Sequence, residues 1–222
     1  MNKTDKVNAI LVAGGAGFIG INLIKELIKR NRDYKIIIID NLTLGKKDNI
    51  PENSNLLFIN LDISEFKIFS SCINRLNTNY NINEVWHLAA NSDIPSGVKD
   101  LNIDYKNTFL TTLNIIKTFK NYNLNKIHFA SSSAIYGDFG EHLISEESGP
   151  LMPISNYGSF KLGSEAVLSS FVEDNNCKLY IYRFPNVVGS PASHGIIYDF
   201  VRKLNNNSSF LIANNISSSV KF

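Results

Sequence analysis

The fold is decided near the N-terminus by residues 9–20, which read AILVAGGAGFIG. The first five of these residues are apolar, as in a buried strand, and Gly14, Gly15 and Gly17 follow at once. The apolar spacing of a helix begins inside the same segment, at Phe18. Glycine permits a tight turn and a close approach of the backbone to a ligand, and a helix N-terminus favours an anion. The segment therefore predicts a strand, a turn and a helix that together hold the pyrophosphate of a dinucleotide.

The same alternation of strand and helix continues along the chain. Short β-branched runs alternate with longer stretches of helical spacing, which is typical of parallel strands joined by right-handed helical crossovers. The expected strands are Ala9–Ala13, Lys35–Asp40, Leu56–Asn60, Glu84–Leu88, Lys126–Ser131 and Leu179–Phe184. The expected helices are Phe18–Lys29, Glu65–Leu76, Asp104–Phe119 and Tyr157–Glu173. We therefore predict an α/β fold, a doubly wound parallel sheet of the Rossmann type.

Composition narrows the choice of partner. The 222 residues are 44% hydrophobic, enough for one full core, and the formal charge of +2 favours neither nucleic acid nor an anionic membrane. Cys72 and Cys177 lie far apart without metal-ligand spacing, so we expect free thiols and no metal. The apolar run at residues 9–13 is too short for a signal peptide or a membrane span. We expect a cytoplasmic protein whose partner is a small molecule or another protein.

A carboxylate at the end of the second strand indicates which dinucleotide is bound. Asp40 lies twenty residues beyond Gly20, where a carboxylate accepts hydrogen bonds from a ribose 2'-hydroxyl and repels a 2'-phosphate. Because no Arg follows Asp40 immediately, NAD is favoured over NADP. The alternative is a plain turn between strand and helix.

Two further segments follow strands at the same edge of the sheet. Asp62 and Ile63 come just after the third strand, where contact with the adenine end of the cofactor is expected; an ordinary turn aspartate is the alternative. The fourth strand leads through His87 into Leu88, Ala89 and Ala90, whose small side chains would let a cofactor lie against the backbone. His87 itself is expected to be structural.

Tyr157 and Lys161 are candidates for proton transfer. They are four residues apart at the start of a helix and therefore share a face, and that face is expected to meet the strand end that carries Ser132. A nearby ammonium would lower the pKa of the tyrosine from about 10 by roughly 1 to 3 units. The serine hydroxyl would orient the alcohol that is oxidised. Each residue taken alone is more simply a surface tyrosine, a solvated lysine or a turn serine.

These motifs resemble the short-chain dehydrogenase/reductase superfamily, in its extended branch of NAD-dependent sugar epimerases and dehydratases. The resemblance runs from Ala9 to about Asp199 and rests on residues 14–20, 40–42, 87–90, 131–137, the pair Tyr157 and Lys161, and residues 183–189. It implies catalysis by Ser132, Tyr157 and Lys161, and contacts to the substrate from Ser132, Ser133 and Asn186. The cofactor contacts that we expect are Gly14, Gly17, Phe18, Ile19, Gly20, Asp40, Asn41, Asp62, Ile63, Leu88, Ala89, Ala90, Tyr157 and Lys161.

The resemblance also indicates the reaction. Sugar 4,6-dehydratases carry an Asp-Glu pair directly after the catalytic hydroxyl residue, whereas Ser133 and Ala134 occupy those places here. The expected reaction is therefore that of a UDP-glucose 4-epimerase, which interconverts UDP-glucose and UDP-galactose through a transient 4-keto sugar. A reductase or decarboxylase of the same branch, or a non-catalytic NAD-binding module, are the alternatives.

Family members continue beyond this length with a smaller lobe that grips the nucleotide sugar. We therefore expect residues 1–190 to form the NAD-binding domain and residues 191–222 to begin a substrate lobe that is incomplete in this chain. In the family, apolar helices equivalent to those from Asp104 and Tyr157 pair across a two-fold axis, so the resemblance implies a homodimer.

Overall fold

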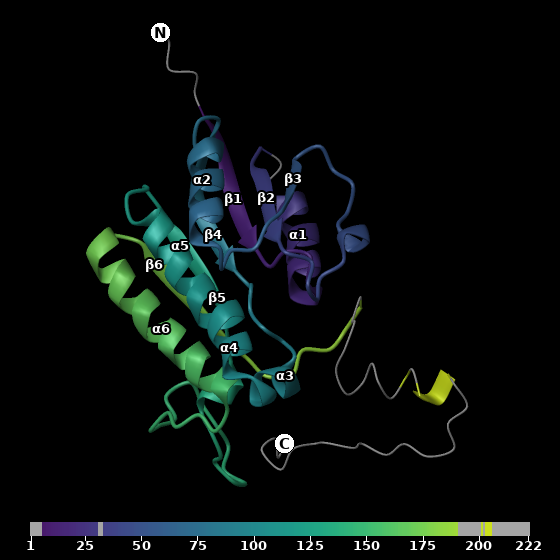
Figure 1. Cartoon of the computed structure of the whole chain (residues 1–222), viewed down its shortest axis with the longest axis vertical. Coiled ribbons are helices and arrows are strands. Elements are labelled where there is room, and N and C mark those ends of the chain that lie inside the picture. The colour runs from purple at the N-terminus through teal and green to yellow at the C-terminus, as the bar shows by residue number, and fades with distance from the viewer. Residues whose placement is uncertain (1–5, 31–32, 191–200, 202, 206–222) are drawn as a thin grey trace.

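The computed structural model describes residues 6–30, 33–190, 201 and 203–205, and these residues form one parallel sheet with helices on both sides (Figure 1). The strands are β1 (Val7–Ala13), β2 (Lys35–Asp40), β3 (Leu56–Asn60), β4 (Tyr80–His87), β5 (Lys126–Ser132) and β6 (Lys178–Phe184). The helices are α1 (Phe18–Arg30), α2 (Phe66–Leu76), α3 (Ile94–Lys99), α4 (Leu101–Asp104), α5 (Thr111–Phe119) and α6 (Asn156–Asn175). Three short helical segments complete the list, the 3-10 turns η1 (Lys47–Asn49) and η3 (Ser133–Ile135) and the π-helical η2 (Tyr105–Leu110).

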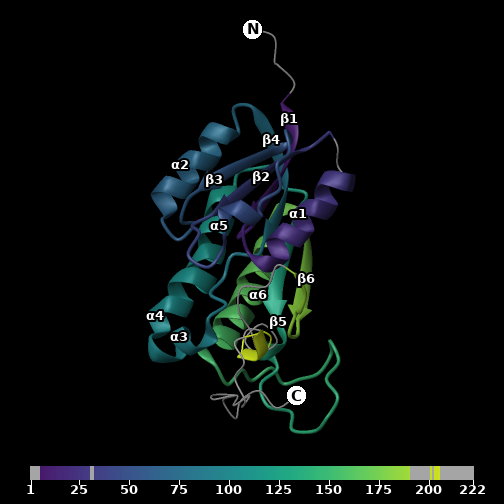
Figure 2. The same cartoon turned by 90° about the vertical axis from the view of Figure 1, so that its right-hand side faces the viewer.

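The strand order is β3-β2-β1-β4-β5-β6, and every neighbouring pair is parallel. Successive strands are added toward one edge of the sheet from β1 to β3 and toward the other edge from β4 to β6, and open α/β sheets bind ligands at the point between β1 and β4 where this order reverses. Helices α2, α5 and α6 cover one face, and α1 lies on the other (Figures 1 and 2). The predicted doubly wound parallel sheet is confirmed.

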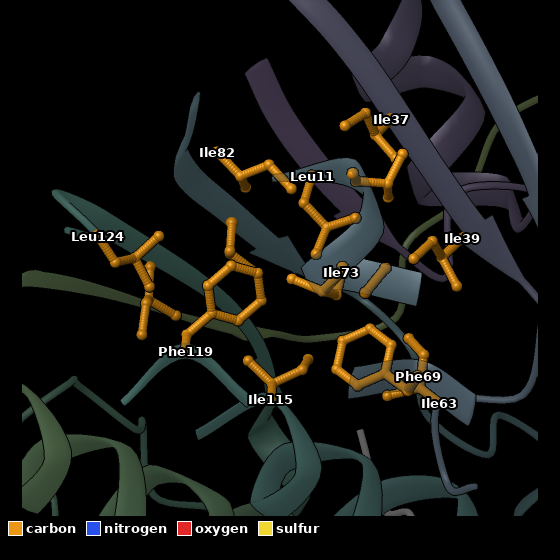
Figure 3. Packing of buried hydrophobic residues seen from close by; sticks show 14 of the residues in the cluster. Leu11, Ile37, Ile39, Ile63, Phe69, Ile73, Ile82, Ile115, Phe119 and Leu124 are labelled. Carbon is orange, nitrogen blue, oxygen red and sulfur yellow. The ribbon is translucent and has the colours of Figure 1, made fainter. Parts of the chain in front are cut away.

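Alternating side chains of the central strands fill two separate cores. Leu11 and Ile39 point to the face of α2 and α5, where they join Phe69, Ile73 and Ile115 in the larger core (Figure 3). The residues between them along the strands, such as Ile10, Val12 and Ile38, pack against α1 on the other face. Both faces of β1 and β2 are therefore apolar, which explains the unbroken hydrophobic runs in the sequence.

The expected helix over Asp104–Phe119 is interrupted and begins earlier. It consists of α4, the π-helical η2 and α5, and a separate helix, α3, precedes it. Helix α3 was not predicted because Pro95 and Gly97 are poor helix formers; Asp93 starts it by accepting a hydrogen bond from the Ser96 amide with its side chain.

The fourth strand is longer than predicted at its start. It begins at Tyr80, four residues before the expected Glu84, because the polar residues there pair with the start of β1. Its register shifts between Ala9 and Ile10, so that Ile82 and Glu84 face neighbouring residues of β1 and Asn83 is left over. The strand ends at His87, and Leu88 already belongs to the following loop. The expected second lobe, residues 191–222, lies almost wholly outside the described residues, so its boundary at 190 stays a prediction.

Candidate functional site

The glycine turn between β1 and α1 is set by close backbone contacts. Gly14 has a φ of 78°, and a Cβ on it would lie 2.5 Å from the backbone nitrogen of Ala89. Gly20 packs on Gly15, where an added Cβ would come within 2.6 Å of the Gly15 Cα. A Cβ on Gly17, by contrast, would meet only the carbonyl oxygen of Gly14, at 3.4 Å. The turn is therefore closed toward the sheet and open at Gly17, as a backbone that receives a phosphate requires.

A cleft lies beside this turn at the carboxyl edge of the sheet. Nine of the expected cofactor residues line it, namely Gly14, Gly17, Asp40, Asn41, Asp62, Ile63, Leu88, Ala89 and Ala90. Seven further residues that line the cleft were not predicted from the sequence, namely Ile39, Thr43, Leu44, Leu61, Asn91, Asn107 and Thr111. Asn107 and Thr111 are four residues apart within the expected helix, and that spacing could have indicated a shared polar face toward the cofactor.

Asp40 ties the glycine turn to the end of β2. Its Oδ2 accepts a hydrogen bond from the Ala16 amide at 2.9 Å, and its Oδ1 accepts one from the Leu42 amide at 2.8 Å. Burial raises the pKa of the carboxyl, although the two amide hydrogen bonds oppose the rise. An ionised carboxylate has about four acceptor positions, so two remain for ribose hydroxyls.

Asp62 is held as well, at the other side of the cleft. Its Oδ1 accepts hydrogen bonds from the Ser64 amide and hydroxyl at 2.9 and 2.7 Å, and Lys106 lies 3.6 Å from Oδ2. Burial acts to raise the pKa of this carboxyl, but the Ser64 hydrogen bonds and the Lys106 charge outweigh it and lower the pKa. Asp62 is thus a turn residue that also lines the cleft, and its contact with the adenine end stays a prediction.

The cleft fits the adenosine diphosphate half of a dinucleotide. An open glycine turn leads into α1, whose first turn carries no acidic side chain, and a buried carboxylate with spare acceptor capacity faces the same space. The remaining expected contacts do not line this cleft. Phe18 and Ile19 line a separate apolar hollow between α1 and β6 with the residues that follow it. Gly20 lies within α1, and Tyr157 and Lys161 lie in α6.

Helix α6 begins against the end of β5. The Ser155 hydroxyl accepts a hydrogen bond from the Gly158 amide at 3.1 Å and so caps the helix. A Cβ on Gly158 would lie 2.5 Å from the carbonyl oxygen of Ala134, which shows how closely the first turn of the helix packs on η3. The side-chain amide of Asn156 donates a hydrogen bond to the carbonyl oxygen of Gly97 at 3.0 Å, which joins the helix to α3.

This packing brings the three expected catalytic residues together. Ser132, at the end of β5, lies close enough to the Tyr157 side chain to lower its pKa. The Lys161 ammonium donates a hydrogen bond to the carbonyl oxygen of Ala130 at 2.5 Å and lies 5.6 Å from the centre of the Tyr157 ring. It also lies 4.8 Å from the centre of the Phe129 ring. The expected convergence of strand end and helix face is therefore observed.

The expected lowering of the tyrosine pKa is wrong for this structure. Burial raises the pKa of Tyr157 to about 12; the Ser132 hydrogen bond opposes the rise and the negative charge of Asp104 adds to it. Burial lowers the pKa of Lys161 to about 7, against the opposing effect of the Glu165 carboxylate. Removal from water thus pushes both groups toward their neutral forms, since the Lys161 ammonium is bound to a carbonyl rather than to the phenol oxygen.

Three more residues named from the sequence have distinct positions. His87 is fully buried, accepts or donates one hydrogen bond to the Thr112 hydroxyl at 2.8 Å, and has no partner at Nδ1, in keeping with a structural role. Burial, together with the Lys161 charge, lowers its pKa to about 3. Ser133 is exposed at the start of η3, and Asn186 is exposed just beyond β6, so their substrate contacts stay predictions.

No group of three or more His, Cys, Asp or Glu side chains among the described residues is placed to hold a metal ion. No helix among the same residues has both the length and the apolar character needed to cross a membrane.

Comparison with known proteins places these features in a family. The model of the NAD dependent epimerase/dehydratase family matches residues 10–222. A putative UDP-glucose 4-epimerase of Methanocaldococcus jannaschii is 35% identical over 208 residues, which make up 91% of this chain and 65% of that protein. A UDP-glucose 4-epimerase of Halalkalibacterium halodurans is 30% identical over 182 residues, 82% of this chain and 52% of that protein. The chain thus spans less than two thirds of the length of these relatives.

Solved structures show the same likeness. A Thermus thermophilus UDP-glucose 4-epimerase in complex with NAD superposes with a TM-score of 0.81 at 28% identity, covering 90% of this chain and 63% of that one. A UDP-N-acetylglucosamine 4-epimerase of Methanobrevibacter ruminantium, in complex with UDP-N-acetylmuramic acid, superposes with a TM-score of 0.78 at 30% identity. That match covers 95% of this chain and 66% of the other.

Proposed function

Because the chain belongs to the NAD-dependent epimerase/dehydratase family, we propose that it acts as a nucleotide-sugar 4-epimerase of the UDP-glucose/UDP-galactose type. The family confirms the expected cofactor, NAD. The observation that carries the proposal is the meeting of Ser132, Tyr157 and Lys161 at the carboxyl end of β5, the edge at which the cleft also lies.

The adenosine half of NAD would be held by the glycine turn and by Asp40, and the bound cofactor supplies the capacity to take up a hydride and return it. The Tyr157 phenol would take the proton of the sugar 4-hydroxyl and later give it back, while the Ser132 hydroxyl orients that oxygen. Lys161, in its charged form, would stabilise the phenolate. Carbon 4 would thereby pass through a keto form and be reduced from its other face.

The residues beside Ser132 favour epimerisation over dehydration. Elimination of water would need an acid next to the catalytic hydroxyl, and Ser133 and Ala134 supply none. A reductase or an oxidative decarboxylase of the family is distinguished by its net change in cofactor. A reductase would consume NADH and an oxidative decarboxylase would produce it, whereas an epimerase ends each cycle with NAD.

A second candidate function is a non-catalytic NAD-binding module. It is favoured by one observation, that burial pushes Tyr157 and Lys161 toward their neutral forms. This candidate predicts NAD binding without turnover of any sugar nucleotide.

One experiment separates these candidates. The purified chain is analysed by mass spectrometry for retained NAD and is then incubated with UDP-glucose and with UDP-galactose, and the stereochemistry of the products is read by NMR. Interconversion without accumulation of NADH supports the epimerase. Retained NAD without conversion of either sugar contradicts it and supports the binding module.

We also propose that the chain forms a homodimer through the outer faces of η2, α5 and α6. Tyr105, Phe109 and Phe160 form an aromatic cluster there, and Tyr105 and Leu101 are exposed despite their apolar character. A monomer by light scattering at micromolar concentration would contradict this assembly.

A further inference from the structure

A buried ion pair lies directly behind the proposed proton-transfer residues. Glu165 is one helical turn beyond Lys161 and two beyond Tyr157, so the three side chains share one face of α6. The Glu165 side chain is 6% exposed and that of Arg183, on β6, is 23% exposed. Arg183 Nη2 donates to Glu165 Oε2 at 2.9 Å and Nε donates to Oε1 at 3.2 Å, a two-pronged contact that fixes both groups in orientation.

Glu165 also joins the helix to the strand that carries Ser132. The Ser131 hydroxyl donates a hydrogen bond to Glu165 Oε1. Two consecutive residues of β5 thus bond to successive turns of α6: Ala130 accepts from Lys161, and Ser131 donates to Glu165. The next residue, Ser132, lies close enough to Tyr157 to lower its pKa. A shift of the helix along the strand would break both hydrogen bonds and separate Tyr157 from Ser132.

Arg183 extends the same network to the segment that precedes Tyr157 in the sequence. Its Nη1 donates to the Tyr136 hydroxyl at 3.0 Å and to the carbonyl oxygen of Glu146 at 2.8 Å. The guanidinium also lies 5.3 Å from the centre of the Tyr136 ring. One side chain therefore connects β6, the end of η3 and the loop that leads into α6.

We propose that Glu165 and Arg183 are positioning residues for the epimerase reaction, because they hold the turns of α6 that carry Tyr157 and Lys161 in register with the end of β5. Neither residue lines the cleft of the adenosine half. Their effect on turnover rests on the proposed function, whereas their effect on the state of Lys161 does not.

The charge of Glu165 supports this assignment. Its carboxylate raises the pKa of Lys161 against the effect of burial, and thereby favours the ammonium form. The other titratable groups near Lys161 are Tyr157 on the same helix and His87 at the end of β4; Asp104 acts on Tyr157. Among these groups, Glu165 is the one that favours the charged lysine.

Glu165→Gln tests the proposal, since it keeps the size of the side chain and removes its charge. We expect kcat to fall about tenfold or more, with unchanged KM and NAD affinity, and the alkaline limb of the pH profile of kcat to move to lower pH. Glu165→Asp, which restores the charge, should return part of the activity and move the limb back. Unchanged kcat together with an unshifted profile would overturn the proposal.

Glu84→Gln is the matched control. Glu84 is a half-buried carboxylate that pairs with Lys126 at 3.5 Å, at the amino end of the sheet. Loss of the Glu84 charge should leave both kcat and the pH profile unchanged.

If Glu165→Gln does not fold, Ser131→Ala tests the proposal instead, because it removes only the contact between β5 and Glu165. It should lower kcat in the same manner, and wild-type kinetics in this variant would overturn the proposal.

A measurement without turnover separates this inference from the proposed function. The Nζ resonance of Lys161 is followed by 15N NMR as a function of pH and is assigned by its loss in Lys161→Arg. In Glu165→Gln its titration midpoint should move to lower pH. If the wild type fails to convert any UDP-sugar but this shift occurs, the proposed function is wrong and the positioning role stands. An unshifted midpoint overturns the role even in an active enzyme.

Discussion

The two ends of the proposed cofactor site are built in different ways. The adenosine end depends on short stretches of consecutive chain: the glycine turn contacts Asp40, twenty-four residues after Ala16, and the first residues after neighbouring strands. The catalytic end depends on a helix, a strand end and an ion pair from the edge strand β6. The first end is therefore set largely by backbone groups at turns and strand ends, and the second by side-chain contacts between a helix and two strands.

The two ends also differ in electrostatics. At the adenosine end, amide groups and the charge of Lys106 hold Asp40 and Asp62 as acceptors in place. At the catalytic end, burial drives Tyr157 and Lys161 toward neutral forms, with pKa values of about 12 and about 7. The acceptors of the adenosine end are therefore already in place for a ligand. At the catalytic end, the surroundings of Tyr157 must first change so that they favour its charged form before a phenolate can form at neutral pH.

The largest effect is expected from Tyr157→Phe at the catalytic end. Loss of the phenol oxygen removes the proposed acid and base, so turnover of UDP-sugars should fall about 10²- to 10⁴-fold, while NAD affinity changes little. Coupled assay and calorimetric NAD titration measure the two quantities. Tyr122→Phe is the control, because Tyr122 and Lys126 have the same spacing but lie outside α6. Wild-type turnover in Tyr157→Phe would contradict the assignment of proton transfer to Tyr157, and with it the catalytic role of this end of the site.

At the adenosine end, Gly14→Ala should have the largest effect. The new Cβ would lie 2.5 Å from the Ala89 nitrogen at a φ of 78°, so stability should fall by about 2 to 5 kcal/mol and NAD affinity should drop with it. Urea unfolding and NAD titration test this expectation. Gly140→Ala is the control, since Gly140 also has a positive φ, of 61°, but nothing lies within 4 Å of its added Cβ. An equal loss in both variants would show that strain, and not the contact with Ala89, is decisive.

Asp40→Asn should weaken NAD binding about tenfold, because a neutral amide replaces a charged acceptor of the ribose hydroxyls. The preference for NAD over NADP should narrow as well, since the charge that repels a 2'-phosphate is lost. Calorimetric titration with both cofactors measures the change, with the exposed Asp174→Asn as control. Unaltered affinity for NAD would mean that Asp40 serves only to hold the glycine turn.

The last prediction concerns His87 and the stability of the protein in acid, since at neutral pH this residue is expected to have little effect. Its folded pKa of about 3 lies below the unfolded value of about 6.5, so the unfolded chain binds more protons between these values. Stability should therefore fall as pH drops through this window, by up to roughly 1.4 kcal/mol per pH unit from this group. His87→Gln should flatten this part of the curve of unfolding free energy against pH, and the exposed His142→Gln should not. An unchanged slope in His87→Gln would contradict a neutral buried histidine.

The sequence alone predicted the fold class and most of the residues that line the adenosine cleft. Short unbroken apolar runs such as Ile36–Ile39, bounded by polar residues, are typical of strands buried on both faces, and a glycine turn followed by Asp40 at the next strand end is typical of a dinucleotide site. The bounds of β2 and β3 were predicted to the residue for the same reason.

Only the tertiary structure decided which protonation states Tyr157 and Lys161 favour at the catalytic end. The spacing of Tyr157 and Lys161 places them on one face, but their pKa values depend on burial and on which atom the ammonium contacts, and that atom is the carbonyl oxygen of Ala130. The role inferred for Glu165 and Arg183 likewise depends on a contact between residues eighteen positions apart in different elements. Periodicity within one helix carries no information about such contacts, because they arise when separate elements pack together.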